Sequence, residues 1–114
     1  MIAVIFEMWP AAGRTDEYFE LAASLKKDLE QMDGFIAVER FESVTTKGQY
    51  LSLSFWRDDG AVHAWRNLAR HRMAQTLGRG GLFADYRLRV ASVLRDYGLK
   101  ERDDAPLDSH DWHG

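Results

Sequence analysis

The segment YLSLSFWRDDGAVHAWRNLARHRMAQ, residues 50–75, decides the fold class. Its first part alternates between two side-chain faces, as a β-strand does, and ends at Trp56. A helix start follows at residue 58 or 59, and apolar residues then recur at helical spacing. A strand that leads directly into a helix places Trp56, Trp65 and His71 at the edge between a sheet and its covering helix. Small α+β domains have ligand clefts at such edges.

The rest of the chain supplies the other elements of a small α+β domain. Apolar runs with strand character alternate with one further stretch of helical period, and glycines mark the turns. The expected elements, in chain order, are a strand at 2–9, a helix from the N-cap Thr15 to a stop at Gly34, strands at 35–44 and 50–56, a helix ended by Gly78, Gly80 and Gly81, and a strand at 83–94. This β-α-β-β-α-β order predicts a ferredoxin-like fold with a four-stranded antiparallel sheet.

The first strand predicts a homodimer. Residues 2–9 are apolar on both faces, with Glu7 the exception, so both faces of this strand should be covered. Two helices can cover only one face of a four-stranded sheet. The simplest cover for the other face is the same sheet of a second copy. We therefore expect a homodimer that packs sheet to sheet.

Composition excludes several classes of protein. The chain has 114 residues, a formal charge of −3 and no cysteine, so a nucleic-acid-binding surface, a disulfide framework and a thiolate nucleophile are not expected. No apolar run reaches the roughly 20 residues of a membrane helix, and the N-terminus MIAVIFEMWP lacks signal-peptide features. We expect a cytoplasmic protein with one domain at residues 1–98. Residues 99–114 would form a polar tail held by Trp112.

With these elements in place, the chain resembles the antibiotic biosynthesis monooxygenase family of dimeric α+β barrels. The resemblance covers residues 1 to about 97. It is carried by the opening MIAVIFEMWP, the second strand DGFIAVERFES and the segment LSLSFWRDDGAVHAWRNLARHRMAQTLGRGGLFADYRLRV, in which Trp56 and Trp65 have the family's W-x8-W spacing and His71 follows. The family includes cofactor-independent oxygenases of aromatic polyketides, heme-degrading oxygenases, quinol oxygenases and members without known activity.

The heme-degrading branch of this family makes a specific comparison possible. Its pattern adds an asparagine on the first strand and a heme-ligating histidine ten residues after the second tryptophan. Those positions here are Glu7 and Gln75. Glutamine is not a useful axial ligand for heme, and His71 comes too early in register to replace it. We therefore expect no tight heme binding, and no other bound cofactor or metal.

His71 is the candidate general base, because imidazole can gain and lose a proton near neutral pH. On one continuous helix, however, His71 is about 120° away from Trp65, which makes it a solvated surface residue. The catalytic role requires a break in the helix near Asn67 and Leu68. Glu7 is the second catalytic candidate; its alternative is a structural ion pair with Arg40 or with an arginine of the last strand.

Four further residues are candidates for substrate binding. Trp65 lies on the apolar stripe of its helix, so it can pack in the core, form a wall against an aromatic substrate, or both. Trp56 ends a strand and can be purely structural. Tyr86 can donate a hydrogen bond to a substrate oxygen or simply pack. Arg40 can contact a substrate or pair with Glu7.

Missing motifs narrow the chemistry. The chain has no GxGxxG, no P-loop, no nucleophile elbow and no metal-binding His-Glu pair. A redox reaction must then take its electrons from the substrate, and a deprotonated phenol or quinol can react with oxygen directly. The sequence predicts a small monooxygenase of phenolic or quinol-like molecules that uses O2 and no bound prosthetic group. The alternative is a non-catalytic dimeric ligand-binding protein of the same fold.

Overall fold

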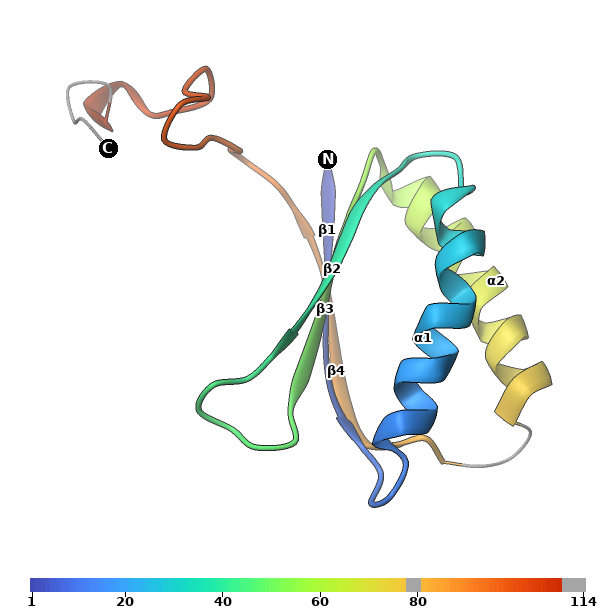
Figure 1. The fold of residues 1–114 in the computed structure, drawn as a ribbon. Helices are drawn as coiled ribbons and strands as arrows, with labels where there is room; N and C mark the ends of the chain where they lie inside the picture. The colour runs from blue at the N-terminus through green and yellow to red at the C-terminus, as the bar shows by residue number, and fades with distance from the viewer. Residues whose placement is uncertain (78–80, 110–114) are drawn as a thin grey trace.

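The computed structural model describes residues 1–77 and 81–109, and for residues 74–77 and 109 the backbone alone. The predicted β-α-β-β-α-β order is confirmed (Figure 1). The elements are β1 (Ile2–Pro10), α1 (Thr15–Glu30), β2 (Phe35–Glu42), β3 (Tyr50–Trp56), α2 (Asp59–Leu77), β4 (Phe83–Ser92) and a short 3-10 helix η1 (Leu107–Ser109). None of the helices in these ranges is long and apolar enough to cross a lipid bilayer.

The sheet has the order β2-β3-β1-β4, and all three strand pairs are antiparallel. Both helices lie on one face, and the other face carries no element of the described chain (Figure 1). Cross-strand pairing decides which side chains share a face, because directly opposed residues point the same way. Phe6 on β1 opposes Ser52 on β3 and Leu88 on β4, and Val4 opposes Ser54 and Val90. These rungs face the helices.

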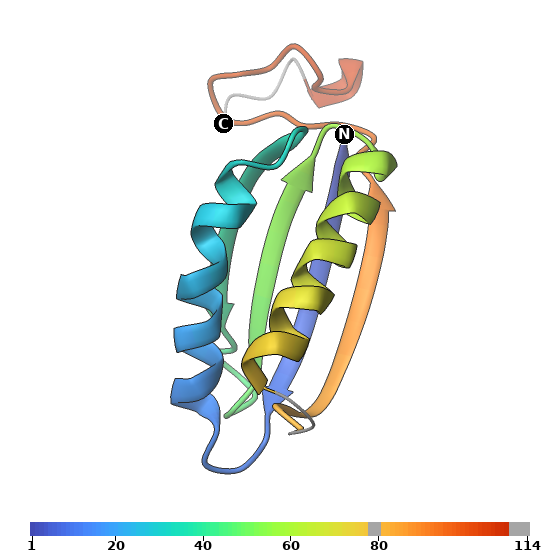
Figure 2. The same cartoon turned by 90° about the vertical axis from the view of Figure 1, so that its right-hand side faces the viewer.

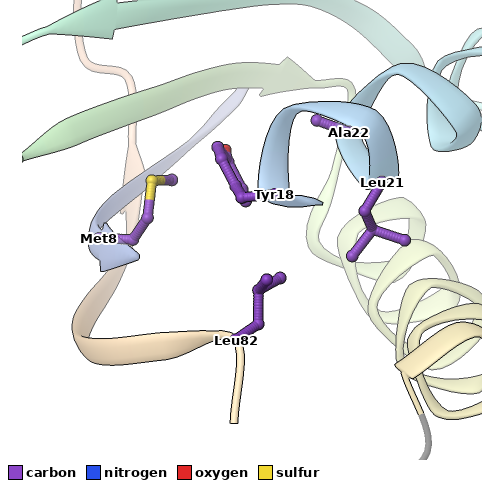
Figure 3. Packing of buried hydrophobic residues seen from close by; sticks show 5 residues of the cluster. All are labelled: Met8, Tyr18, Leu21, Ala22 and Leu82. Atoms are coloured by element: carbon purple, nitrogen blue, oxygen red, sulfur yellow. The ribbon is translucent and has the colours of Figure 1, made fainter. Parts of the chain in front are cut away.

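The core between helices and sheet consists of two clusters. One contains Met8, Tyr18, Leu21, Ala22 and Leu82, and Figure 3 shows the side chains of Met8, Tyr18 and Leu82 directed toward one another. The other contains Leu29, Trp56, Ala61 and Val62. The first cluster fixes α1 to the start of β4, and the second fixes the start of α2 to the sheet.

The helix ends differ in part from the sequence expectation. The N-cap of α1 is Arg14, not Thr15, and its guanidinium forms an ion pair with Glu17 at 2.7 Å. The C-cap is Gln31, so Gly34 is not the C′ stop of this helix. At the start of α2, Asp58 acts as the cap, because its Oδ1 accepts a hydrogen bond from the Ala61 backbone N–H at 2.9 Å.

Gly34 has a different role, at the crossing of two connections. Its φ is +88°, and a Cβ built on it would lie 2.6 Å from the Cβ of Ala61. Its carbonyl also accepts a hydrogen bond from the Arg57 backbone N–H at 2.8 Å. Only glycine has both the required backbone conformation and the room, so this residue brings the start of β2 against the start of α2.

The strand β2 also departs from simple alternation. A register shift between Phe35 and Ala37 places Phe35 against Trp56, with ring centroids 5.4 Å apart, on the same side as Val38. Strict alternation along the strand would put Phe35 on the face of Ala37. The strands β2 and β4 end at Glu42 and Ser92, earlier than the predicted residues 44 and 94.

The face opposite the helices has an apolar centre with charges toward its edges. Ile5 opposes Leu53, and Ala3 opposes Phe55. Glu7 lies on this face too, and its carboxylate forms an ion pair with Arg89 at 3.1 Å.

After Ser92 the chain runs away from the sheet on this side (Figure 1). Trp112, the expected anchor of the tail, lies outside the described residues.

Candidate active-site cavity

A cavity of about 460 Å³ lies between α2 and the helix-facing side of the sheet. It exists because α2 leaves the edge strand β4 uncovered (Figure 2). Tyr86, Leu88 and Val90 on this strand are therefore 60%, 43% and 47% exposed in the single chain. The lining comes from every strand but β2 and from one helix: Val4 and Phe6, Ser52 and Ser54, Val62, Trp65, Arg66, Ala69, Arg70 and Met73, and Phe83, Tyr86, Leu88 and Val90. Its volume is in the range of small-molecule sites.

A second cavity of about 160 Å³ adjoins the first toward α1. The two share Phe6, Ser52, Trp65, Ala69, Met73 and Phe83, so they are neighbours that meet at the Trp65 side chain. Arg40 reaches this inner part from β2 and lies near the Tyr18 phenol. Burial raises the pKa of Tyr18, and its contact with Arg40 acts in the opposite direction.

The two tryptophans have different positions. Trp65 contacts both cavities, whereas Trp56 is fully buried behind it. The two indoles are stacked, with centroids 6.2 Å apart and planes 28° apart. The Trp56 Nε1–H donates a hydrogen bond to Ser54 Oγ at 2.9 Å. Trp56, a predicted substrate contact, thus supports the cavity wall without lining it.

The polar groups of the lining are two serine hydroxyls, a phenol and two guanidinium groups. Arg66 and Arg70 lie one turn apart on α2, and Tyr86 lies on the opposite wall. Among the described lining residues of the larger cavity there is no carboxylate and no imidazole. The site is therefore apolar with a positive rim, and it can hold and polarise an anionic or phenolic molecule.

The predicted catalytic residues are not brought into this space. His71 is exposed, does not line either cavity, and lies on a helix that continues unbroken from Asp59 to Leu77, without the break that its catalytic role requires. Glu7 points to the opposite face of the sheet, where it contributes to a separate hollow of about 370 Å³. The side chain of Gln75 lies outside the described residues.

Four polar residues of the lining were not among the candidates from the sequence. Ser52 and Ser54 alternate with apolar residues, so the strand pattern places both on one face, but it does not show that this face borders a cavity. Arg66 and Arg70 are spaced i, i+4, which places them on one helix face. The signal was present, but the position of β4 was needed to interpret it.

Comparison with known proteins identifies the relatives of this arrangement. Residues 1–77 match the family model described as antibiotic biosynthesis monooxygenase. The chain is 47% identical over 93 residues to the jasmonate monooxygenase ABM of Pyricularia oryzae, covering 82% of this chain but 43% of that protein. It is 30% identical over 99 residues to the uncharacterized protein YqjZ of Bacillus subtilis, covering 87% and 84% of the two chains. The chain thus spans less than half the length of the fungal relative.

Solved structures share the fold. The heme-degrader MhuD of Mycobacterium tuberculosis, with two hemes bound, superposes with a TM-score of 0.67 at 20% identity, over 86% of this chain and 100% of that one. SnoaB, a cofactor-independent oxygenase from Streptomyces nogalater, gives a TM-score of 0.67 at 9% identity, over 83% and 94%. At these identities the likeness is one of fold alone.

Proposed function

Because the chain belongs to the antibiotic biosynthesis monooxygenase family, we propose that it is a small monooxygenase of a phenolic or quinol-like aromatic molecule. It uses O2 and no bound prosthetic group. The observation that carries this proposal is the mainly apolar cavity beside Trp65, which lies against the sheet and is bordered by two arginines. An aromatic ring fits between such walls, and the arginines stabilise the anion that reacts with oxygen.

The proposed reaction balances without an added reductant. A phenol and O2 give a quinone and water: one oxygen atom becomes the new carbonyl on a ring carbon, and the other leaves as water. The substrate loses four electrons and O2 gains four. The phenolate is the more easily oxidised form, so loss of the phenolic proton comes first.

The proposed roles of the chain's own residues follow from their positions. Trp65 and Tyr86 contact the ring, and Arg40 borders the inner end. Since the described lining offers no imidazole or carboxylate, the phenolic proton passes to solvent at the mouth of the cavity. The guanidinium groups favour the phenolate and so lower the free-energy cost of deprotonation. A general-base role for His71 is the alternative proposal. The carboxylate of Glu7 has a structural partner in Arg89 instead.

Oxygen consumption by the purified protein, measured over a panel of hydroquinones and anthrones, tests the proposal. Jasmonate belongs in the panel because the fungal relative is named for it. Ala69→Trp fills the space shared by both cavities and should reduce turnover at least tenfold, whereas Ala64→Trp, on the exposed side of α2, should not. Incorporation of one ¹⁸O atom from ¹⁸O2 into the product identifies a monooxygenase.

A non-catalytic ligand-binding protein is the second candidate, and the absence of a described base in the cavity lining favours it. Binding of panel compounds without oxygen consumption above the buffer blank would decide for it. Heme degradation is the third candidate. After mixing with hemin and gel filtration we expect no Soret band in the protein fraction, and a retained band would support the heme-degrading alternative.

We also propose the sheet-to-sheet homodimer, supported by the apolar centre of the face that no described element covers. Leu53→Glu places a charge in that centre and should convert a dimer into a folded monomer. Val44→Glu, at a fully exposed loop position, is the control. Analytical ultracentrifugation at micromolar concentration distinguishes the two states, and a monomeric wild-type protein would refute the dimer.

A further inference from the structure

The rim of the cavity carries positive charge without a matching carboxylate. Arg66 and Arg70 both line the larger cavity from α2. Among the described residues, no carboxylate forms an ion pair with either of them. Arg66 contacts an imidazole instead of a carboxylate, since its Nη2 lies 3.2 Å from Nδ1 of His63. The chain as a whole has a formal charge of −3, so this local excess of cations is not a general property of its surface.

Other arginines of the same region are paired. Arg72, on the same helix, lies 3.4 Å from the carboxylate of Asp28 on α1 and does not line the cavity. Arg57, just before α2, forms ion pairs with Asp33 and Asp58 at 3.0 Å. One arginine of the helix and one just before it thus form ion pairs within the fold, whereas no carboxylate of the described residues pairs with the two at the cavity.

The geometry of α2 lets both guanidinium groups reach one anion. Residues spaced i, i+4 lie about 6 Å apart on one helix face, less than the span of two extended arginine side chains. A guanidinium group binds a carboxylate through two parallel hydrogen bonds, and the low dielectric of an apolar wall strengthens that attraction. Val62, Ala69, Leu88 and Val90 provide such a wall directly beside them.

We propose that the ligand of this cavity is an apolar molecule with a carboxylate group, which Arg66 and Arg70 hold at the rim. Its apolar body extends along Leu88 and Val90 toward the Trp65 indole, so the end opposite to the acid lies innermost. The identification of this acid as the substrate rests on the proposed function. The binding preference itself does not depend on turnover.

A carboxylate fits this rim better than a phosphate group. Phosphate sites usually add backbone N–H donors from a helix N-terminus or a glycine-rich loop. The N-terminus of α2 is capped by the Asp58 carboxylate and belongs to the buried cluster around Trp56, not to the rim. The rim therefore offers side-chain guanidinium groups beside an apolar wall, which is the environment for a small organic acid.

The test compares naphthalene-2-carboxylate with naphthalene-2-carboxamide, which has nearly the same shape and no charge. Affinity is measured by isothermal titration calorimetry on the full chain at pH 7. We expect the acid to bind at least tenfold more tightly than the amide. Arg66→Gln and Arg70→Gln should each weaken acid binding by about 3–10-fold, between the effect of an exposed ion pair and that of a charge-assisted hydrogen bond, and leave amide binding unchanged. The matched control is Arg72→Gln, which should alter neither.

Two outcomes would overturn the inference. One is equal affinity for acid and amide in the wild-type protein. The other is an equal loss of acid binding in Arg72→Gln and Arg70→Gln, which would mean that only the overall charge of the helix matters. Circular dichroism of each variant confirms that it is folded.

Oxygen consumption separates this inference from the proposed function. The substrates are 2,5-dihydroxybenzoate and its methyl ester. We expect Arg70→Gln to raise KM for the acid at least threefold more than KM for the ester, because the ester lacks the charge that this guanidinium holds. Since the guanidinium groups also favour the phenolate, kcat should fall by the same factor for both substrates. Acid-selective binding without oxygen consumption would refute the oxygenase and leave the ligand class standing. Turnover of both compounds with equal KM would refute the ligand class and leave the oxygenase standing.

Discussion

Replacing Trp56 by alanine should destabilise the protein more than replacing Trp65, although Trp65 is the residue at the cavity. Trp56 is 0% exposed and packs against both Phe35 and Trp65, with ring centroids at 5.4 and 6.2 Å. It also donates the hydrogen bond to Ser54. Trp65 is only partly buried and has the one stacked partner.

The magnitudes follow from these contacts. A buried Trp→Ala change costs about 3–5 kcal/mol, and aromatic pairs add about 0.5–1.5 kcal/mol each, so Trp56→Ala belongs near the upper end, at about 5 kcal/mol. For Trp65, which borders empty space on one side, we expect about 2–3 kcal/mol. A domain of this size has roughly 6–17 kcal/mol of stability, so both variants should fold.

Urea unfolding followed by circular dichroism measures the difference. With an m-value of about 2 kcal/mol/M, a gap of about 2 kcal/mol separates the two midpoints by about 1 M. Equal midpoints, or a lower midpoint for Trp65→Ala, would refute the assignment of Trp56 as the support and Trp65 as the wall. In the ligand-binding assay the order should reverse, with Trp65→Ala losing more affinity than a Trp56→Phe variant that keeps the buried ring.

Three further predictions concern the backbone at Gly34, the candidate general base His71 and the loss of stability at acidic pH. Gly34→Ala should lower the free energy of unfolding by about 1–3 kcal/mol more than Gly13→Ala and so give the lower melting temperature, because both positions have positive φ but of the two only Gly34 lacks room for a Cβ; equal melting temperatures would contradict this. His71→Ala should reduce kcat less than tenfold, since the imidazole is exposed outside the cavity, and a loss of about 10²–10⁴-fold would establish it as the general base. The hydrogen bond from Arg57 lowers the pKa of Asp33, so its stabilising effect is present above the ordinary carboxyl pKa and is lost as the pH falls through the lowered value. Arg57→Gln should therefore be less stable than wild type at pH 7, and in urea titrations this difference should shrink below about pH 4; a difference independent of pH would refute the linkage.

Much of the fold was predictable because its signals are local. The change from a two-residue to a 3.6-residue apolar period lies within a few residues of each element boundary, and it gave the order of all six main elements. The exceptions have local causes that the pattern does not contain. The bulge at Phe35 depends on how β2 pairs with β3, and the use of Gly34 depends on a contact with α2.

The sequence by itself determined the βαββαβ order, the family and the placement of Trp65 on the buried stripe of α2. It could not determine which face of β1 the helices cover, because a strand that is apolar on both sides has no polar face to mark it. Only the tertiary structure put Glu7 on the far face and left β4 open beside α2, so that Arg66 and Arg70 border a cavity. The physical reason is that periodicity reports the direction of a side chain relative to its own element, whereas a site depends on which other element lies opposite.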